Sequence, residues 1–347
     1  MSKLSQYIGV GVAEDGRYIR KRVYGNSKAE LERNRLKLLR EYEDITHPSS
    51  ITFREYAEKW LRVYKSSREV ATLDMYENCL KKTKTIDYVP LKDIRQTDLQ
   101  SIITENADHP NVCSKLRLLF RQIWGSAIAD GILSKDITTR LNLPVLVRQE
   151  ARSLTRAEVQ AVKTADLDPM DRMYVNLLYY FGLRPGEALA VMPQDFNLTD
   201  RTLTVSRAIG YDKNNYYLKP CKTRKTRTIP IPEEFLPQLK AYLRTHKSMY
   251  LIHRDDHPLS KSSNVKMWAR IKKEINRQLG GNSNLDRTNG LHPYVFRHNF
   301  CGECLYRGLS VMKCSQLMGN SPQVVMNVYA HLDDSREPLE DFYKLSM

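Results

Sequence analysis

Hydrophobic and polar residues alternate near the start of the chain and later repeat every three or four positions, so the periodicity changes from that of a strand to that of a helix. Over residues 1–46 the alternation runs on both sides of Asp15-Gly16, a dipeptide typical of a tight hairpin turn. Helical spacing then begins at about Lys28. This segment is predicted to be a small β-sheet backed by one helix.

The second predicted strand, residues 17–24, gathers basic and aromatic side chains on one face. Tyr18, Arg20 and Arg22 lie on the same side, because successive strand side chains point to opposite faces. A solvated edge strand would also carry lysine and arginine, but the interleaved tyrosines favour a nucleic-acid surface. We therefore expect these three residues to contact DNA.

Residues 51–145 have helical spacing throughout. Thr52 and Glu55 match a capping box, in which two side chains satisfy free backbone donors at a helix start. An apolar stripe follows and is interpreted as core rather than as a ligand site; it consists of Phe53, Tyr56, Trp60 and Tyr64. Further helices are predicted at about 69–84, 95–106, 110–130 and 133–141. The segment is predicted to be all-α.

The last segment, residues 153–347, begins with a second capping box at Thr155 and Glu158. Its helices flank a region in which three stretches have strand character: Thr202–Ser206, the surroundings of Tyr216–Leu218, and Thr226–Ile231. The predicted fold class is therefore multidomain α+β, with a small N-terminal β-sheet plus helix, an all-α domain, and a mainly α domain with a small β-sheet.

Charge narrows the choice of partner. The 55 Lys+Arg against 40 Asp+Glu give a net charge of +15, which favours nucleic acid or an acidic membrane face. Residues 201–250 alone hold 11 Lys/Arg against 3 Asp/Glu.

No apolar run approaches the ~18 residues of a spanning helix, and no secretory signal opens the chain, so a cytoplasmic protein without a membrane partner is expected. Six irregularly spaced cysteines predict reduced thiols, and no metal or other cofactor is expected.

Two arginines have the chemistry that a DNA phosphodiester requires. A planar guanidinium donates paired hydrogen bonds to phosphate oxygens and keeps its charge. Arg184 follows a predicted helix that ends at Gly182, and Glu187, three residues on, can orient it. Arg297 lies in Tyr-Val-Phe-Arg-His. For the Arg184 motif alone, a surface arginine after a helix end remains an alternative interpretation.

A lysine and a tyrosine could complete a reaction that needs no metal. Lys222 lies in what resembles the tip and second strand of a hairpin, where an ammonium could protonate a leaving oxygen. Arg224, Lys225 and Arg227 follow, and this charge run is expected to bind or steer DNA phosphate. Tyr329 is the candidate nucleophile, because nearby cations help a phenol to ionise.

Together these motifs resemble the tyrosine recombinase or integrase family, especially the three-domain integrases of phages and conjugative transposons. The resemblance covers nearly the whole chain. It implies an arm-type DNA-binding domain at 1–46, a helical core-binding domain of the SAM-like kind at 51–145, and a catalytic domain at 153–347. The motifs that carry it are Gly182-Leu-Arg184-Pro-Gly-Glu187, Lys222 with Arg227, Phe296-Arg297-His298, and Tyr329-Ala-His331.

The resemblance also implies a mechanism and partners. Tyr329 would attack to form a 3′-phosphotyrosyl link, Arg184 and Arg297 would hold the phosphate, and Lys222 would protonate the departing 5′-hydroxyl. The partners would be double-stranded DNA with core and arm sites, three further copies in a homotetrameric synapse docked through the tail Pro338–Met347, and an excisionase or DNA-bending protein. The expected location is the nucleoid of a bacterial cell.

Two positions depart from the family pattern. Tyr294 stands where a histidine is usual, and Asn320 stands where a histidine or tryptophan is usual. Either side chain can donate a hydrogen bond to phosphate, but the amide is neither an acid nor a base. His298, beside Arg297, is interpreted as a structural residue. A catalytically impaired DNA-binding relative therefore remains an alternative, as does a nicking-closing topoisomerase, although the arm-like first segment argues for paired sites.

Overall fold

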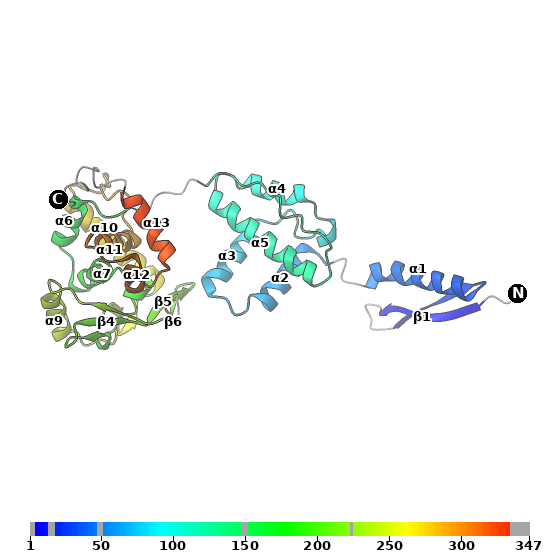
Figure 1. Ribbon diagram of the computed structural model, residues 1–347, viewed down its shortest axis with the longest axis horizontal. Coiled ribbons are helices and arrows are strands. Elements are labelled where there is room, and N and C mark those ends of the chain that lie inside the picture. Colours follow the sequence, from blue (N-terminus) through cyan, green and yellow to red (C-terminus); the bar gives the residue numbers. More distant parts are fainter. Residues whose placement is uncertain (1–3, 13–17, 47–50, 147–151, 223–224, 334–347) are drawn as a thin grey trace, which may run out of the picture. The chain divides into compact units, whose positions relative to one another are not determined.

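The computed structural model describes residues 4–12, 18–46, 51–146, 152–222 and 225–333. The chain divides into two compact units, Met1–Val147 and Arg148–Met347 (Figure 1). The fold class is the expected mixture of helices with small sheets. Among the described residues, no helix has both the length and the apolar character needed to cross a bilayer.

The first unit begins with a hairpin and a helix that share a small core. Strand β1 (Leu4–Val12) pairs antiparallel with β2 (Tyr18–Gly25), and helix α1 (Lys28–Thr46) follows. Ile8 and Val23 are buried, with Leu31 and Leu38 of α1 packed against them. The predicted turn at Asp15-Gly16 lies outside the described residues.

The rest of the first unit is mainly helical. The capping box of Thr52 and Glu55 is present, and the buried side chains of Tyr56 and Trp60 lie in the core with aromatic residues of the last helix. Tyr64 differs from the expected stripe: it is 46% exposed, and its hydroxyl donates to Asp130. The helices are α2 (Phe53–Tyr64), α3 (Val70–Leu80), the 3₁₀ helix η2 (Leu91–Asp93), α4 (Gln96–Glu105) and α5 (Pro110–Ala129).

The short helix predicted at 133–141 is wrong: this described stretch forms bends and a turn. The Asp136 carboxylate accepts hydrogen bonds from the Thr138 backbone N–H at 2.8 Å and from its hydroxyl at 2.6 Å. Such a local side-chain bond offers the backbone an alternative to a helix. Leu141 is nevertheless buried in the same core, so the apolar spacing reflected packing rather than helix.

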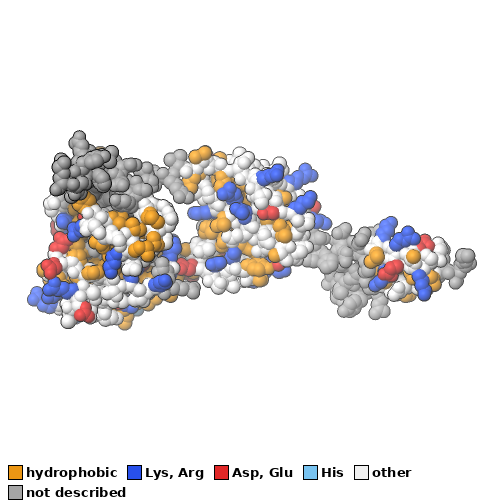
Figure 2. All heavy atoms as spheres, in the orientation of Figure 1, with side chains coloured by type: hydrophobic (Ala, Val, Ile, Leu, Met, Phe, Trp, Pro, Cys, Tyr) orange, Lys and Arg blue, Asp and Glu red, His pale blue; other side chains and the backbone are white. Residues whose placement is uncertain are grey.

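Figure 2 shows lysine and arginine side chains scattered over the visible face of the helical residues 51–146, with few acidic side chains among them.

The second unit surrounds a larger core, in which the contacting helices α7 and α11 take part. Its helices are α6 (Arg156–Thr164), α7 (Pro169–Phe181), α8 (Pro185–Ala188), η3 (Pro193–Asp195), α9 (Leu236–Thr245), α10 (Lys261–Gln278), α11 (Pro293–Tyr306), α12 (Val311–Met318) and α13 (Pro322–Asp333).

The strands of the second unit form separate small sheets. A three-stranded antiparallel sheet has the order β3 (Phe196–Asn197), β4 (Thr202–Val205), β7 (Arg227–Pro230). Two hairpins accompany it: β5 (Arg207–Asp212) with β6 (Asn215–Pro220), and β8 (His253–Arg254) with β9 (His257–Pro258). Strands β3, β5, β8 and β9 were not predicted.

The pairing of these strands changes the expected position of Lys222. The expectation was a hairpin tip, but β6 pairs with β5 whereas β7 pairs with β4. Lys222 lies in the connection that leads from one sheet to the other, in a turn after the buried Cys221. Two residues of this connection, 223 and 224, are outside the described part of the chain.

Candidate active site

Helix α7 ends at a glycine that turns the chain toward Arg184. Gly182 has a φ of +56°, and a Cβ built there would lie 2.5 Å from Cδ1 of Phe300 on α11. A left-handed backbone and a close neighbour both favour glycine at this position. The buried Leu183 follows, and Arg184 is the residue that caps α8. The local structure therefore holds the Arg184 backbone in one place.

Arg184 is held by three partners. Its Nη1 donates to Oε1 of Glu187 at 2.8 Å, which is the contact that the spacing predicted. Its Nη2 donates to the carbonyl oxygen of Gly319 at 2.8 Å and to Oδ1 of Asn320 at 2.6 Å. Because a guanidinium only donates, the amide of Asn320 turns its oxygen to Arg184 and keeps its NH₂ donors for another acceptor.

Arg297, on α11, converges on the same region. Its Nη1 donates to the carbonyl oxygen of Gly182 at 2.6 Å, and its Nη2 to that of Met318 at 2.5 Å. Burial, and then the charge of Arg184, lower the pKa of Arg297 to about 9. A bound anion would reverse this shift, because an opposite charge favours the ionised form. Arg184 and Arg297 thus form a candidate anion site.

Arg227 corrects one expectation. It was grouped with charges expected to bind or steer DNA phosphate, but its side chain is only 7% exposed. Arg297 is also buried, at 4%, so the partners of Arg227 set it apart more than its burial does. Its Nη2 lies 2.6 Å from Oε2 of Glu187, its Nη1 lies 3.1 Å from Oε1, and its Nε donates to the carbonyl oxygen of Leu317 at 2.8 Å. The physical reason is strand alternation: Arg227 shares the inward face of β7 with the buried Ile229. That alternation was visible in the sequence and could have identified it.

Glu187 joins two of the arginines. Its side chain is 1% exposed, and burial opposes its ionisation. The hydrogen bond and charge of Arg227, with those of Arg184, outweigh that penalty and hold the pKa of Glu187 below its usual value. The carboxylate therefore stays charged and binds both guanidinium groups.

Three successive carbonyl groups at the end of α12 each accept from a different arginine. The carbonyl of Leu317 accepts from Arg227, that of Met318 from Arg297, and that of Gly319 from Arg184. The last carbonyls of a helix have no partner within it and carry partial negative charge. We call this arrangement, defined by carbonyls 317–319 and these three arginines, the arginine cap of α12. No sequence pattern indicated it.

The remaining candidates are the proposed general acid, the charges that follow it, and the proposed nucleophile. Lys222 and Lys225 are exposed, whereas Arg224 lies outside the described residues. Tyr329 lies within α13, which begins just beyond the cap, and the structure describes its backbone but not its side chain.

Tyr294 and His298 lie close to Arg297 in sequence, whereas Asn320 follows the end of α12. Tyr294 is 48% exposed on the first turn of α11. His298 is partly buried, and its Nδ1 has no partner among the described residues. Burial, followed by the charge of Arg297, lowers the pKa of His298. A neutral structural imidazole agrees with these surroundings.

Residues 149–336 match the model of the phage integrase family, and residues 52–105 match that of the phage integrase N-terminal SAM-like domain. The chain belongs to the phage integrase family. Among similar proteins of this family, the tyrosine recombinase XerD of Pseudomonas aeruginosa is 26% identical over 234 residues, 64% of this chain and 71% of that protein. The tyrosine recombinase XerA of Pyrococcus furiosus is 30% identical over 199 residues, 56% of this chain and 62% of that protein.

Solved integrases share the fold of this phage integrase family member. The Tn1549 transposon integrase in complex with circular intermediate DNA matches with a TM-score of 0.70 at 15% identity, covering 86% of this chain and 100% of that one. A lambda integrase tetramer bound to a Holliday junction matches with a TM-score of 0.61 at 15% identity, covering 90% and 88%. At these identities the likeness establishes the fold.

The N-terminal hairpin of this integrase-family chain presents the expected basic face in part. Arg22 is exposed, its guanidinium lies 5.3 Å from the ring centre of Tyr7 and 5.6 Å from that of Tyr24, and it donates to Ser5. The helix covers the opposite face, through Val23. The side chains of Tyr18 and Arg20 are outside what the structure describes.

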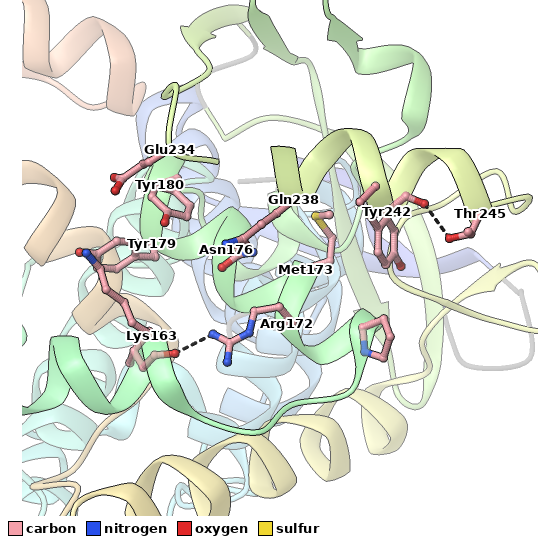
Figure 3. Close-up of a pocket in the computed structure, with 13 residues that line it drawn as sticks. Lys163, Arg172, Met173, Asn176, Tyr179, Tyr180, Glu234, Gln238, Tyr242 and Thr245 are labelled. Carbon is pink, nitrogen blue, oxygen red and sulfur yellow. Dashed lines mark hydrogen bonds between the residues drawn. The ribbon is translucent and has the colours of Figure 1, made fainter. Parts of the chain in front are cut away.

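A separate cavity of about 610 Å³ lies among α6, α7 and α9 (Figure 3). The guanidinium of Arg172 reaches into its lining, but it donates to the backbone carbonyls of Val162 and Ala165. Lys163 lies over the ring of Tyr179 at 5.9 Å. Arg172 is thus committed to the backbone, and we assign no role to this cavity.

Proposed function

We propose that this protein is a tyrosine site-specific recombinase, which cuts and rejoins DNA through a 3′-phosphotyrosyl intermediate to integrate or excise a mobile element. The observation that carries the proposal is the convergence of Arg184 and Arg297 on one helix end, immediately before the helix of Tyr329. The whole arrangement lies within the residues that match the phage integrase family.

The proposed reaction needs only the side chains of the chain and the DNA. The Tyr329 phenol passes its proton to the solvent and its oxygen attacks phosphorus. The bond from phosphorus to the 5′-oxygen breaks, and that oxygen leaves with a proton from Lys222. Arg184 and Arg297 bind the non-bridging oxygens and their growing charge. The 5′-hydroxyl of the partner strand then reverses the step, so the tyrosine leaves and the DNA is rejoined.

Tyr294 and Asn320 support rather than exclude this reaction. Tyr294 is 48% exposed, and the NH₂ of Asn320 is not used by Arg184. Both can donate hydrogen bonds to a phosphate oxygen, which is a stabilising role that does not require an acid or a base. The catalytically impaired alternative therefore has less support than the enzyme.

The three segments would then divide the recognition of DNA. We propose that residues 1–46 bind arm sites through the face of Arg22, that residues 51–145 bind the core site, and that residues 153–347 hold the reacting phosphate. The chain would act as a homotetramer at the nucleoid. A tetramer is the form in which lambda integrase is bound to a Holliday junction. An excisionase or DNA-bending protein would set the direction of the reaction.

Covalent trapping tests the proposal. The full chain is incubated in EDTA with labelled duplexes from the DNA that flanks its own gene, and denaturing gels detect a protein–DNA adduct. We expect an adduct with the wild-type chain and none with Tyr329→Phe. Tyr306→Phe is the matched control, because Tyr306 is 70% exposed on α11 and should not matter.

The other outcomes separate the alternatives. Tight binding without an adduct, on duplexes that the protein protects from nuclease, would favour the impaired DNA-binding relative. An adduct on any sequence, with relaxation of plasmids that lack the flanking DNA, would favour a nicking-closing topoisomerase.

A further inference from the structure

We propose that Arg227 is a positioning residue for the phosphate-binding arginines and does not itself contact DNA. The inference rests on the proposed function, because it assigns Arg184 and Arg297 to the reacting phosphate. Arg227 would act through Glu187 and through the end of α12. It would thereby fix the separation between the guanidinium groups and the helix of Tyr329.

The first line of support is the shared carboxylate. Glu187 accepts from Arg184 at 2.8 Å and from Arg227 at 2.6 and 3.1 Å. A buried carboxylate keeps one position when two planar guanidinium groups hold it from different sides. Without Arg227, the Glu187 carboxylate would pair with one guanidinium group instead of two. Its position, and with it that of the Arg184 guanidinium, would then change.

The second line of support is the packing at Gly319. A Cβ at this glycine would lie 3.2 Å from Nη1 of Arg227, so the guanidinium fits closely against this turn. The Gly319 carbonyl is the acceptor of Arg184, and Asn320 follows it. Arg227 also donates to the Leu317 carbonyl at 2.8 Å. It therefore lies against the residues on either side of Met318, whose carbonyl accepts from Arg297. Displacing Arg227 would therefore move the acceptors of both other arginines.

The third line of support is the position of Arg227 in the chain. It is the first residue of β7, paired with Val205 of β4, and it ends the connection that carries Lys222. One side chain thus anchors that connection to the end of α12. The general acid and the phosphate site would share this anchor.

A buried ion pair can also be purely structural, so the test must separate stability from positioning. The probe is the duplex on which the wild-type chain forms its Tyr329 adduct, and single-turnover cleavage is measured for Arg227→Met and Arg227→Lys. Arg201→Lys is the matched control, because Arg201 pairs with Glu233 at a similar distance, 2.7 Å, with both side chains exposed. We expect Arg227→Met to cleave about 100-fold more slowly, since a displacement near 1 Å can cost that much.

Arg227→Lys keeps the charge but loses the forked contact, so we expect a loss of about 10-fold, while Arg201→Lys cleaves at the wild-type rate. DNA affinity and its salt dependence should not change for either Arg227 variant. A fall of about one in the slope of log affinity against log salt would overturn the proposal, because it would identify a phosphate contact.

A charge-neutral substrate gives the decisive comparison. Replacing one non-bridging oxygen of the cleaved phosphate by methyl removes the charge that Arg184 and Arg297 neutralise. If Arg227 acts through them, the deficit of Arg227→Met should shrink at least 5-fold on the methylphosphonate duplex. An equal deficit on both duplexes, with a lower melting temperature, would mean a structural role only. If the wild-type chain forms no adduct, the proposed function fails, and this inference fails with it.

Discussion

Replacing Gly182 by alanine tests whether the path from α7 to Arg184 depends on a missing side chain. Two costs add at this position. A non-glycine residue at positive φ costs about 1 kcal/mol. The new methyl group would also lie 2.5, 2.6 and 2.9 Å from atoms of Phe300, and forcing extra volume into a packed core costs about 1–3 kcal/mol. We therefore expect Gly182→Ala to lose about 3 kcal/mol.

Gly280→Ala is the control for the backbone cost alone. Gly280 has a φ of +76°, and nothing lies within 4 Å of the position that a Cβ would take there. We expect that variant to lose only about 1 kcal/mol. For a unit of this size, each kcal/mol lowers the melting temperature by about 2–4 °C. Calorimetry of the full chain should show the second unit melting about 6–12 °C lower in Gly182→Ala and about 2–4 °C lower in Gly280→Ala.

Equal shifts in the two variants would refute the reasoning, because the contact with Phe300 would then have no cost. A functional effect should accompany the larger shift. The Gly182 carbonyl accepts from Nη1 of Arg297 at 2.6 Å, so a displaced carbonyl also displaces this guanidinium. DNA cleavage should fall in Gly182→Ala more than in Gly280→Ala when both are assayed well below their melting temperatures.

Two further predictions concern acid and salt. Burial lowers the pKa of His298 in the folded chain, whereas in the unfolded chain the imidazole binds a proton near pH 6.5. Because the unfolded chain binds more protons below that pH, the free energy of unfolding should fall as the pH drops below 6.5. Urea midpoints between pH 7.5 and 5.5 should fall less in His298→Gln than in the wild type, and parallel curves would contradict this. Arg22→Ala should reduce the salt slope of arm-site binding by about 0.9, whereas Arg35→Ala, whose arginine pairs with Glu32 on α1, should leave the slope unchanged.

Local rules predicted the elements whose causes are local. Both capping boxes, at Thr52 and Thr155, are present because each needs only a hydroxyl and a carboxylate three residues apart. The N-terminal hairpin follows from strand alternation. The stretch 133–141 was misread because its apolar residues pack on the core from a non-helical segment, and spacing alone does not distinguish the two.

The candidate site was predictable as a set of residues but not as a geometry. Motifs identified Arg184, Arg297 and Glu187, and the contact between the first and the last follows from their spacing. Strand alternation could have shown that Arg227 faces inward, but not what it meets there, because its partners Glu187 and Leu317 lie 40 and 90 residues away along the chain. The arginine cap of α12 joins backbone atoms to side chains from three other elements, so no local pattern records it.

The cap has a further consequence in the balance of charge. Arg184, Arg227 and Arg297 carry three positive charges, and the one carboxylate near them, that of Glu187, pairs with Arg184 and Arg227. These four side chains therefore carry a net charge of +2. A phosphodiester brings one negative charge, whereas the five-coordinate phosphorus of the proposed transfer brings two. The charge of the four side chains would thus be balanced at the five-coordinate stage and not by the intact phosphodiester. Such a site attracts the transition state more strongly than the intact DNA, and that difference is what accelerates a reaction.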